Sequence, residues 1–238
     1  MSAHLRPSTE NLILKSLPSD IYARLAPHLE PVALESSQII HKAHDPVSHF
    51  YFPDYAIISV VSIMSDGATV EVGVVGREGV SGTNALLGHD SSPNQSLIQV
   101  PGSGLRIKTH LLLTEFNRGG VLQNMLLRYV NSLIAQVSQT AACNRLHTVE
   151  ERLARWLLMT HDRTHGDELP LTHEFIAQML GTRRAGVTGA AIALQTEGFI
   201  RYSRGNITII DRAGLEGFAC ECYKIVKKEF DRALGNRN

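Results

Sequence analysis

The spacing of apolar and polar positions changes character along the chain, and in the first half it is typical of strands. From residue 32 to residue 108, short apolar runs and alternation with a period of two are separated by Pro, Gly and Asp. The pair Asp66-Gly67 lies between two such runs and is a strong hairpin signal. Many short strands at regular spacing predict a roll or barrel. The predicted strands are residues 37–40, 48–52, 56–64, 69–75, 95–100 and 105–108, and short helices are predicted before them at 11–17 and 20–29.

Residues 120–147 carry a helical period instead. Six positions follow one another by 4, 3, 4, 3 and 4 residues, which is the a/d spacing of nearly three heptads of a coiled coil. A separate stripe of Leu122, Met125 and Tyr129 is available to pack on the preceding strands. The extra seam therefore predicts a dimer, and the alternative is a helix that packs only on its own barrel. The predicted dimer seam is Leu126, Val130, Leu133, Val137, Thr140 and Asn144.

Residues 171–211 predict a helix, a tight turn, a second helix and a hairpin. Thr172 is a good N-cap for the first helix. Gly181 ends that helix, because glycine tolerates the left-handed conformation that a tight turn needs. Thr182 is the predicted cap of the second helix, over residues 183–195. The hairpin strands are predicted at 199–202 and 206–210, around a turn at 204–206.

The second helix of this pair has two chemically different sides. Val187, Ala190, Ala191 and Leu194 share one face, while Arg184 lies on or near the opposite one. Such a helix suits the major groove of DNA, where Arg neutralises phosphates or binds guanine edges and Thr contacts a base or a thymine methyl. The alternative is an αα-hairpin with solvated arginines. The predicted DNA-binding residues are Thr172, Thr182, Arg183, Arg184, Thr188, Arg201 and Arg204.

Helices are also predicted on both sides of this segment. Residues 149–161 predict the first helix of a C-terminal domain, and residues 161–169 predict a polar linker. Asp211 is the predicted cap of one last helix, which carries an apolar stripe through Leu215, Phe218 and Cys222 to Val226.

Residues 171–211, together with the upstream run Glu150-Glu151-Arg152-Leu153-Ala154-Arg155-Trp156-Leu157-Leu158, resemble the family of the cyclic AMP receptor protein and FNR. The resemblance implies an α+β protein, with a cyclic-nucleotide-binding-like β-roll, a long dimerisation helix and a winged helix-turn-helix. It also implies a homodimer that binds palindromic double-stranded DNA, with RNA polymerase as a further partner. The implied domains are residues 1–119 for the sensor roll, 120–147 for the dimerisation helix and 148–238 for the DNA-binding domain.

Two departures from the family pattern limit what the resemblance implies. Its best-known members carry Arg-Glu and a further Arg in the recognition helix, and this chain keeps Arg184 but has Ala185 and Gly189 at the other two positions. The family's familiar operator sequence is therefore not expected. Cyclic AMP binders of the family also use an Arg where this chain has Asn94-Gln95-Ser96.

The effector of the roll is accordingly left open. In the family's fold, residues 76–96 would hold a ligand, and glycine-rich backbone there can cradle an anion. Without the charge-assisted contact from an Arg, cyclic AMP is disfavoured, while another cyclic mono- or dinucleotide, a different ligand, or none stays open. For Arg77 and Glu78 the favoured interpretation is a solvated turn. The weak effector-binding candidates are Gly76, Arg77, Glu78, Gly79, Asn94 and Gln95.

Charge is unevenly placed in a chain whose formal net charge is zero. Residues 1–119 hold 8 basic and 11 acidic side chains, and residues 120–238 hold 15 and 12. The balance of −3 against +3 predicts a local basic surface in the second half. The sequence shows no apolar run of membrane-spanning length and no signal peptide, so a cytoplasmic protein without a membrane partner is expected.

Cysteine and histidine spacing predicts no metal site. The chain has Cys143, Cys220 and Cys222, which make no disulfide framework, and the Cys220-x-Cys222 spacing is too short for the usual redox or zinc motif. The two cysteines of that pair are expected to be small buried thiols. His41, His44 and His49 are expected to be surface residues rather than metal ligands.

Motifs of common enzymes are absent from the sequence, including a nucleophile elbow, a phosphate-binding P-loop and a zinc-protease motif. The leading hypothesis is therefore a DNA-binding regulator and not an enzyme. The alternative is a ligand-sensing module that docks a protein partner without DNA. Salt dependence distinguishes the two, because DNA binding weakens steeply with salt. Operator sequence, target genes and activation versus repression are not predicted.

Overall fold

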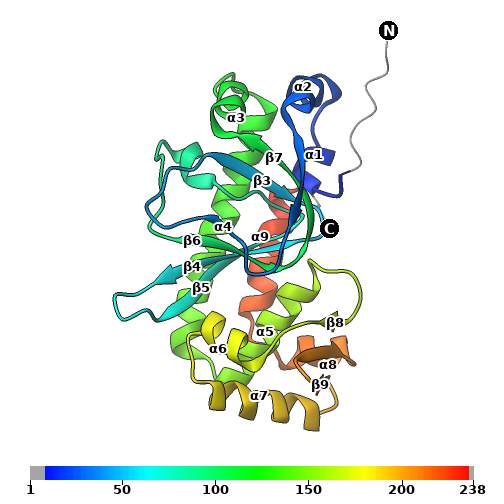
Figure 1. Ribbon diagram of the computed structural model, residues 1–238. Coiled ribbons are helices and arrows are strands. Elements are labelled where there is room, and N and C mark those ends of the chain that lie inside the picture. The colour runs from blue at the N-terminus through cyan, green and yellow to red at the C-terminus, as the bar shows by residue number, and fades with distance from the viewer. Residues whose placement is uncertain (1–8, 236–238) are drawn as a thin grey trace. The chain divides into compact units, whose positions relative to one another are not determined.

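A computed structural model describes residues 9–235 of the chain (Figure 1). These residues divide into two compact units, one of residues 9–60, 74–133 and 230–235, the other of residues 61–73 and 134–229. The division falls inside the long helix α4 (Val121–Leu146). Among the described residues, no helix is both long and apolar enough to cross a membrane.

The first unit is built on antiparallel strands, as the period-two pattern predicts. Phe50 pairs with Ile107 and Phe52 with Leu105 across neighbouring strands, and all four side chains are buried. Such cross-strand apolar pairs stabilise a sheet through side-chain packing. One sheet has the order β1 (Glu30–Leu34), β7 (Gly102–Lys108), β3 (His49–Pro53). A second sheet has the order β2 (Ile39–His41), β6 (Gln95–Val100), β4 (Ile57–Ile63), β5 (Thr69–Val75), and residues 61–73 of its last two strands belong to the second unit.

Short helices flank these strands. Asn11 caps the first helix by accepting the N–H of Leu14 at 3.2 Å, and its amide donates to the carbonyls of Pro53 and Gly79 at 3.1 and 2.8 Å. A single asparagine therefore attaches the helix to the roll. The helices are α1 (Leu12–Lys15), α2 (Ser19–Leu25) and α3 (Thr109–Phe116), with 3-10 turns η1 (Ala26–His28) and η2 (Thr83–Leu87).

Histidine 41 does not lie at the surface. Only 9% of it is exposed, and its ring meets that of Tyr51 edge-on with centroids 5.5 Å apart. The surface expectation was wrong for this residue because position 41 lies on strand β2, at a point where the side chain is buried. His44 is exposed and His49 half-buried.

Burial along α4 differs from the predicted seam. Leu126 and Val130 are 0% and 5% exposed, so in this conformation their side chains are not available to a partner. The helix buries a broad stripe at its own 3.6-residue period, and Leu126 and Val130 lie on that stripe, whereas Val137 of the predicted seam is exposed. The large apolar side chains exposed on α4 are Val121, Leu127, Ile134, Val137 and Leu146.

The second unit contains the predicted helix-turn-helix and hairpin. Helix α5 (Val149–His161) begins with a capping box, in which the Thr148 side chain accepts from Glu151 N–H and the Glu151 carboxylate accepts from Thr148 N–H. The indole N–H of Trp156 donates to Glu71 at 2.8 Å, with both side chains buried. Helix α5 packs against α7 (Arg184–Thr196) and α8 (Arg212–Phe218), and α7 packs against α6 (His173–Leu180). The sheet of this unit has the order β8 (Glu168–Leu169), β10 (Asn206–Ile209), β9 (Ile200–Ser203).

The last helix of the sequence prediction is two helices in the structure. Ala219 has extended backbone, with φ −63° and ψ 147°, so α8 ends before it and α9 (Cys222–Ala233) begins three residues later. Gly217 lies two residues before the break, but a continuous apolar stripe hid the break in the sequence. The break places Cys220 in the connection between the two helices.

Candidate nucleic-acid interface

Helix α6 begins and ends where the sequence predicts. The Thr172 hydroxyl oxygen accepts the N–H of Phe175 at 3.2 Å, which caps the helix and leaves the hydroxyl hydrogen able to donate elsewhere. Gly181 has φ +58°, the left-handed conformation that a glycine adopts at little cost. The turn that follows leads directly into α7.

Helix α7 hides one face and exposes the other, as predicted. Val187, Ala190, Ala191 and Leu194 are each at most 2% exposed. On the outer side, Arg183, Arg184, Ala185 and Gly189 are exposed to solvent. Both arginines thus lie outside the protein core at the start of the helix.

The start of α7 is one residue later than predicted, and Thr182 is not its cap. The N-cap position is Arg183, and no side chain accepts a hydrogen bond there. Helix N-termini with unsatisfied N–H groups and the positive end of the helix dipole attract anions such as phosphate. The half-buried Thr182 lies just before this terminus.

Thr188 is half-buried and already engaged within the protein. Its hydroxyl donates to the carbonyl of Arg184 at 3.1 Å, and its oxygen lies 3.0 Å from Nδ1 of His173. Since a hydroxyl has one hydrogen, His173 is the donor in the second contact. The part of Thr188 that remains for a ligand is therefore its methyl group and one oxygen lone pair.

His173 joins three elements of the interface, and sequence reasoning did not single it out. Its ring stacks on Tyr202 of β9 with centroids 3.9 Å apart and planes 22° apart. Burial and, after it, the charge of Arg184 lower the pKa of His173 from its usual value, which favours the neutral ring. A neutral ring can hold the Nδ1–H tautomer that the contact with Thr188 requires.

The hairpin forms a wing beside these helices. Its turn is Arg204-Gly205, with φ of +50° and +86°, which are typical of the two-residue turns that join antiparallel strands. Arg201 and Arg204 are exposed. The side-chain carbonyl of Gln195 on α7 accepts the N–H of Tyr202 at 2.8 Å, which fixes β9 to the helix.

An exposed isoleucine on α7 also escaped the sequence analysis. Ile192 is 60% exposed although its helix neighbours Ala191 and Leu194 are buried. It lies one helical turn after Thr188, on the outer side, where an apolar group can contact a thymine methyl. Its helical spacing from Ala185 and Gly189 could have identified it in the sequence.

The effector-binding candidates lie elsewhere, in the first unit. Glu78 is only 7% exposed, and its carboxylate accepts the N–H of Gly76 at 3.2 Å. The solvated-turn expectation was therefore wrong for Glu78, because the residue satisfies backbone groups in the interior. A Cβ on Gly79 would lie 2.3 Å from the Tyr129 hydroxyl, so this backbone passes close to α4. Arg77, Asn94 and Gln95 are half-buried.

A family model matches the part of the chain that forms this interface. Residues 151–218 match the Crp-like helix-turn-helix domain. The match spans α5 through α8, so it covers every predicted DNA-binding residue. Comparison with curated proteins finds no match for the chain.

Solved structures share the fold over most of the chain. FixK2 from Bradyrhizobium japonicum is 17% identical with a TM-score of 0.69, covering 81% of this chain and 98% of its own. A putative Crp/FNR-family transcriptional regulator from Eubacterium rectale is 17% identical with a TM-score of 0.68, covering 87% and 96%. The c-di-GMP-responsive global regulator CLP from Xanthomonas campestris is 14% identical with a TM-score of 0.64, covering 81% and 99%.

Proposed function

Because residues 151–218 form a Crp-like helix-turn-helix domain in a chain with the fold of Crp/FNR regulators, we propose that this protein is a sequence-specific DNA-binding transcription regulator. One observation carries the proposal above all. The apolar face of α7 is fully used inside the protein, while Arg183 and Arg184 project into solvent at its N-terminus. Because both arginine side chains are exposed, packing of the protein core does not require arginine at these two positions.

The roles of the interface residues follow from their positions. Arg184 is the proposed base-reading residue, since the N-terminal residues of a recognition helix contact base edges in the major groove. Arg183, Arg201 and Arg204 are proposed phosphate contacts on the helix terminus and the wing. The Thr172 hydroxyl hydrogen is available to donate to a backbone phosphate.

We further propose that the active form is a homodimer that pairs along α4. Leu127, Ile134 and Val137 support this, because they are 41%, 56% and 38% exposed and follow one another by 7 and 3 residues. That is the a, a, d spacing of a coiled-coil seam, and Asn144 continues it. Two copies related by a two-fold axis would present two recognition helices to a palindromic site. RNA polymerase is a partner within this same proposal.

For the effector, we propose only that the roll does not bind cyclic AMP. A phosphate placed at residues 76–79 would meet the buried carboxylate of Glu78, and the Gly76 N–H that could bind it already donates to that carboxylate. Candidates that remain are other cyclic mono- or dinucleotides, among them the c-di-GMP to which the Xanthomonas regulator responds.

The DNA proposal is tested with duplexes that the full-length protein selects from a random library. Fluorescence anisotropy at several salt concentrations then gives affinity and salt slope for the wild type, Arg184→Ala and Arg204→Ala. Losing a bidentate base contact should weaken specific binding about 5- to 150-fold. Losing a phosphate contact should weaken all duplexes similarly and reduce the salt slope by about 1.

Arg118→Ala is the matched control, because Arg118 is exposed in the first unit and outside the interface. It should bind DNA as the wild type does. Unchanged affinity of Arg184→Ala for the selected duplex would overturn the DNA assignment. Binding of a protein partner that is insensitive to salt, with no selected duplex, would favour the alternative of a docking module.

A further inference from the structure

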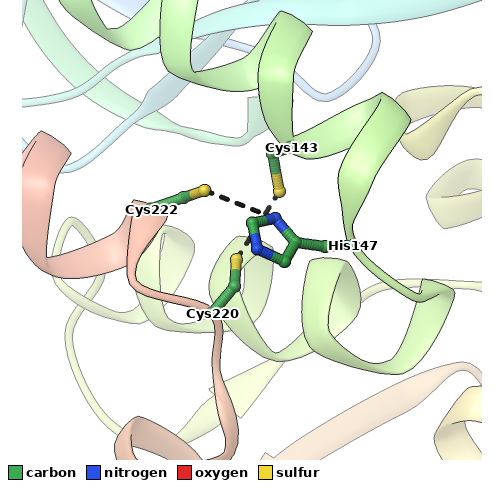
Figure 2. A group of neighbouring side chains, drawn as sticks. All are labelled: Cys143, His147, Cys220 and Cys222. Atoms are coloured by element: carbon green, nitrogen blue, oxygen red, sulfur yellow. Dashed lines mark hydrogen bonds between the residues drawn. The ribbon is translucent and has the colours of Figure 1, made fainter.

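Three cysteines and a histidine meet at one point of the second unit, although the sequence places them in two distant segments. Cys143 lies in the last turn of α4 and His147 just after it, while Cys222 is the first residue of α9 and Cys220 lies two residues before it. Figure 2 shows the three sulfur atoms and the imidazole ring converging on a common centre. One ligand atom from each of the four residues lies within 4.8 Å of all the others. These four residues are called the thiol–imidazole cluster below.

Two distances between atoms of the cluster are those of ligands around one small ion. The sulfurs of Cys143 and Cys220 are 3.6 Å apart, and the sulfur of Cys222 is 3.6 Å from Nδ1 of His147. Zinc binds sulfur at about 2.3 Å and nitrogen at about 2.0–2.1 Å, so a tetrahedron holds two sulfurs about 3.8 Å apart and a sulfur and a nitrogen about 3.6 Å apart. Both distances in the cluster agree with these values within a few tenths of an ångström.

Groups around the cluster orient its members for ligation. The carboxylate of Glu221 lies 3.2 Å from Nε2 of His147, the ring nitrogen that faces away from Cys222. Ligating histidines usually donate their other N–H to a carboxylate or carbonyl, which fixes the tautomer and aims the lone pair at the metal. The Gln139 amide donates to the sulfur of Cys222 at 3.1 Å, which is the contact that a thiolate ligand needs.

Burial and charge also fit an anionic metal centre. Cys143, Cys220 and Cys222 are 0%, 6% and 0% exposed. Two arginines of α5, Arg152 and Arg155, are 8% and 3% exposed and lie within electrostatic range of Cys143. Buried guanidinium groups are costly without a compensating negative charge. Three thiolates around a divalent ion carry a net charge of −1, and supply part of that compensation.

We propose that the thiol–imidazole cluster binds one zinc ion per chain. The ligand atoms are Sγ of Cys143, Nδ1 of His147, Sγ of Cys220 and Sγ of Cys222. Binding displaces the three thiol protons to solvent, and no oxidation or reduction takes place. Four protein ligands fill a tetrahedral site, so the role is structural: the ion links the end of α4 to the connection between α8 and α9.

Two other fates of the same residues predict different outcomes. An iron–sulfur cluster distributes its protein ligands over several irons, and so needs them further apart than a single ion does. A disulfide between Cys143 and Cys220 requires the sulfurs to approach from 3.6 Å to about 2.05 Å and would remove two ligands. Zinc is favoured because His147 and Cys222 lie at the same small centre as Cys143 and Cys220, so that all four side chains can bind one ion.

The test uses the full-length protein, purified anaerobically without a polyhistidine tag, and measures metal by mass spectrometry. About one zinc per chain is expected. Replacement by Co²⁺ should give the strong visible absorption of tetrahedral cobalt with thiolate-to-metal charge transfer, which needs no variant. The expected zinc content of Cys220→Ser and of His147→Gln is below about a tenth of the wild-type value. Glu221→Ala, which alters only the orienting carboxylate, should weaken zinc affinity about 10- to 100-fold.

His89→Gln is the matched control, since His89 is exposed and outside the cluster, and it should retain the wild-type zinc content. The proposal is overturned by any of three results: no bound metal after supply of Zn²⁺, a multi-iron chromophore with acid-labile sulfide, or octahedral cobalt spectra. If Cys220→Ser does not fold, the cobalt spectrum of the wild type and the graded loss in Glu221→Ala still decide the matter.

Discussion

Nδ1 of His173, the first residue of α6, lies 3.0 Å from Oγ1 of Thr188 in the middle of α7. The contact crosses the helix-turn-helix, and the stacking of His173 on Tyr202 extends it to the wing. One imidazole thus connects the three elements that would touch DNA. Helix α6, helix α7 and the wing are therefore held together by a polar contact as well as by apolar packing.

Replacing His173 should loosen this connection, and the Phe and Ala variants separate the contribution of the hydrogen bond from that of the ring. His173→Phe keeps a ring against Tyr202 and removes the hydrogen bond to Thr188, so we expect a loss of about 1 kcal/mol in the free energy of unfolding. His173→Ala removes the ring contact too and should cost roughly 1 kcal/mol more. Urea unfolding of both variants checks the order. Equal stability of the Ala and Phe variants would contradict a role for the ring.

Gly189 offers a test of how closely DNA approaches α7. A Cβ at position 189 would meet no heavy atom within 4 Å, so Gly189→Ala should stabilise the protein by up to about 1 kcal/mol through helix propensity. If the DNA backbone or a base edge packs against this position, the same change should weaken DNA binding. Gly217→Ala, in α8 and equally unobstructed, is the control: it should affect stability alone. Tighter DNA binding by Gly189→Ala would contradict a close approach.

The buried His41 should make the folded state sensitive to acid. Burial, and after it the charge of His49, lowers the pKa of His41 from 6.5 to about 4. Between these two values the unfolded chain takes up a proton that the folded chain does not, so stability falls as pH drops from 6.5 towards 4. The loss should be about 1 kcal/mol at pH 5.5 and about 3 kcal/mol near pH 4.

His41→Phe retains a ring against Tyr51 and removes the titrating group. Urea unfolding at pH 7.5 and pH 5.5 should show a smaller difference between the two pH values for this variant than for the wild type. His89→Gln should keep the wild-type difference, because His89 is exposed. The explanation fails if His41→Phe loses as much stability on acidification as the wild type.

Cyclic AMP should leave the protein unaffected. If its dissociation constant is 1 mM or weaker, the ligand at 1 mM stabilises the folded state by no more than about 0.4 kcal/mol. Thermal unfolding with and without the nucleotide measures this, and cyclic dinucleotides serve as the comparison. A saturable shift at micromolar cyclic AMP would mean that residues 76–79 rearrange to admit a phosphate next to Glu78.

The sequence predicted those parts of the fold that local pattern controls. The roll, the capped α6 with its glycine turn and the buried face of α7 follow from spacing over a few residues. Helix α3 and strand β1 were not predicted: the sequence predicted a helix over residues 20–29 and no strand before residue 37, whereas in the structure Pro31 pairs with Leu105. The conformation of residues 30–34 is therefore determined by pairing with β7 and not by the local sequence pattern.

Contacts between residues that are distant in the sequence could not be predicted from the local pattern. Leu126 was assigned to the dimer seam because a 3.5-residue and a 3.6-residue repeat differ little over three turns, and only burial separates them. The contact between Cys143 and Cys220 joins residues 77 positions apart, so the spacing of Cys220 and Cys222 gave no sign of it. His173 looked like an ordinary polar residue in the first turn of a helix.

Trp156 is the one tryptophan of the sequence, and its indole N–H donates to Glu71 on β5 from a buried position on α5. The wavelength of its fluorescence emission therefore reports whether β5 and α5 stay in contact. A shift to the red on adding DNA or a small molecule would reveal their separation in solution, with no label attached to the protein.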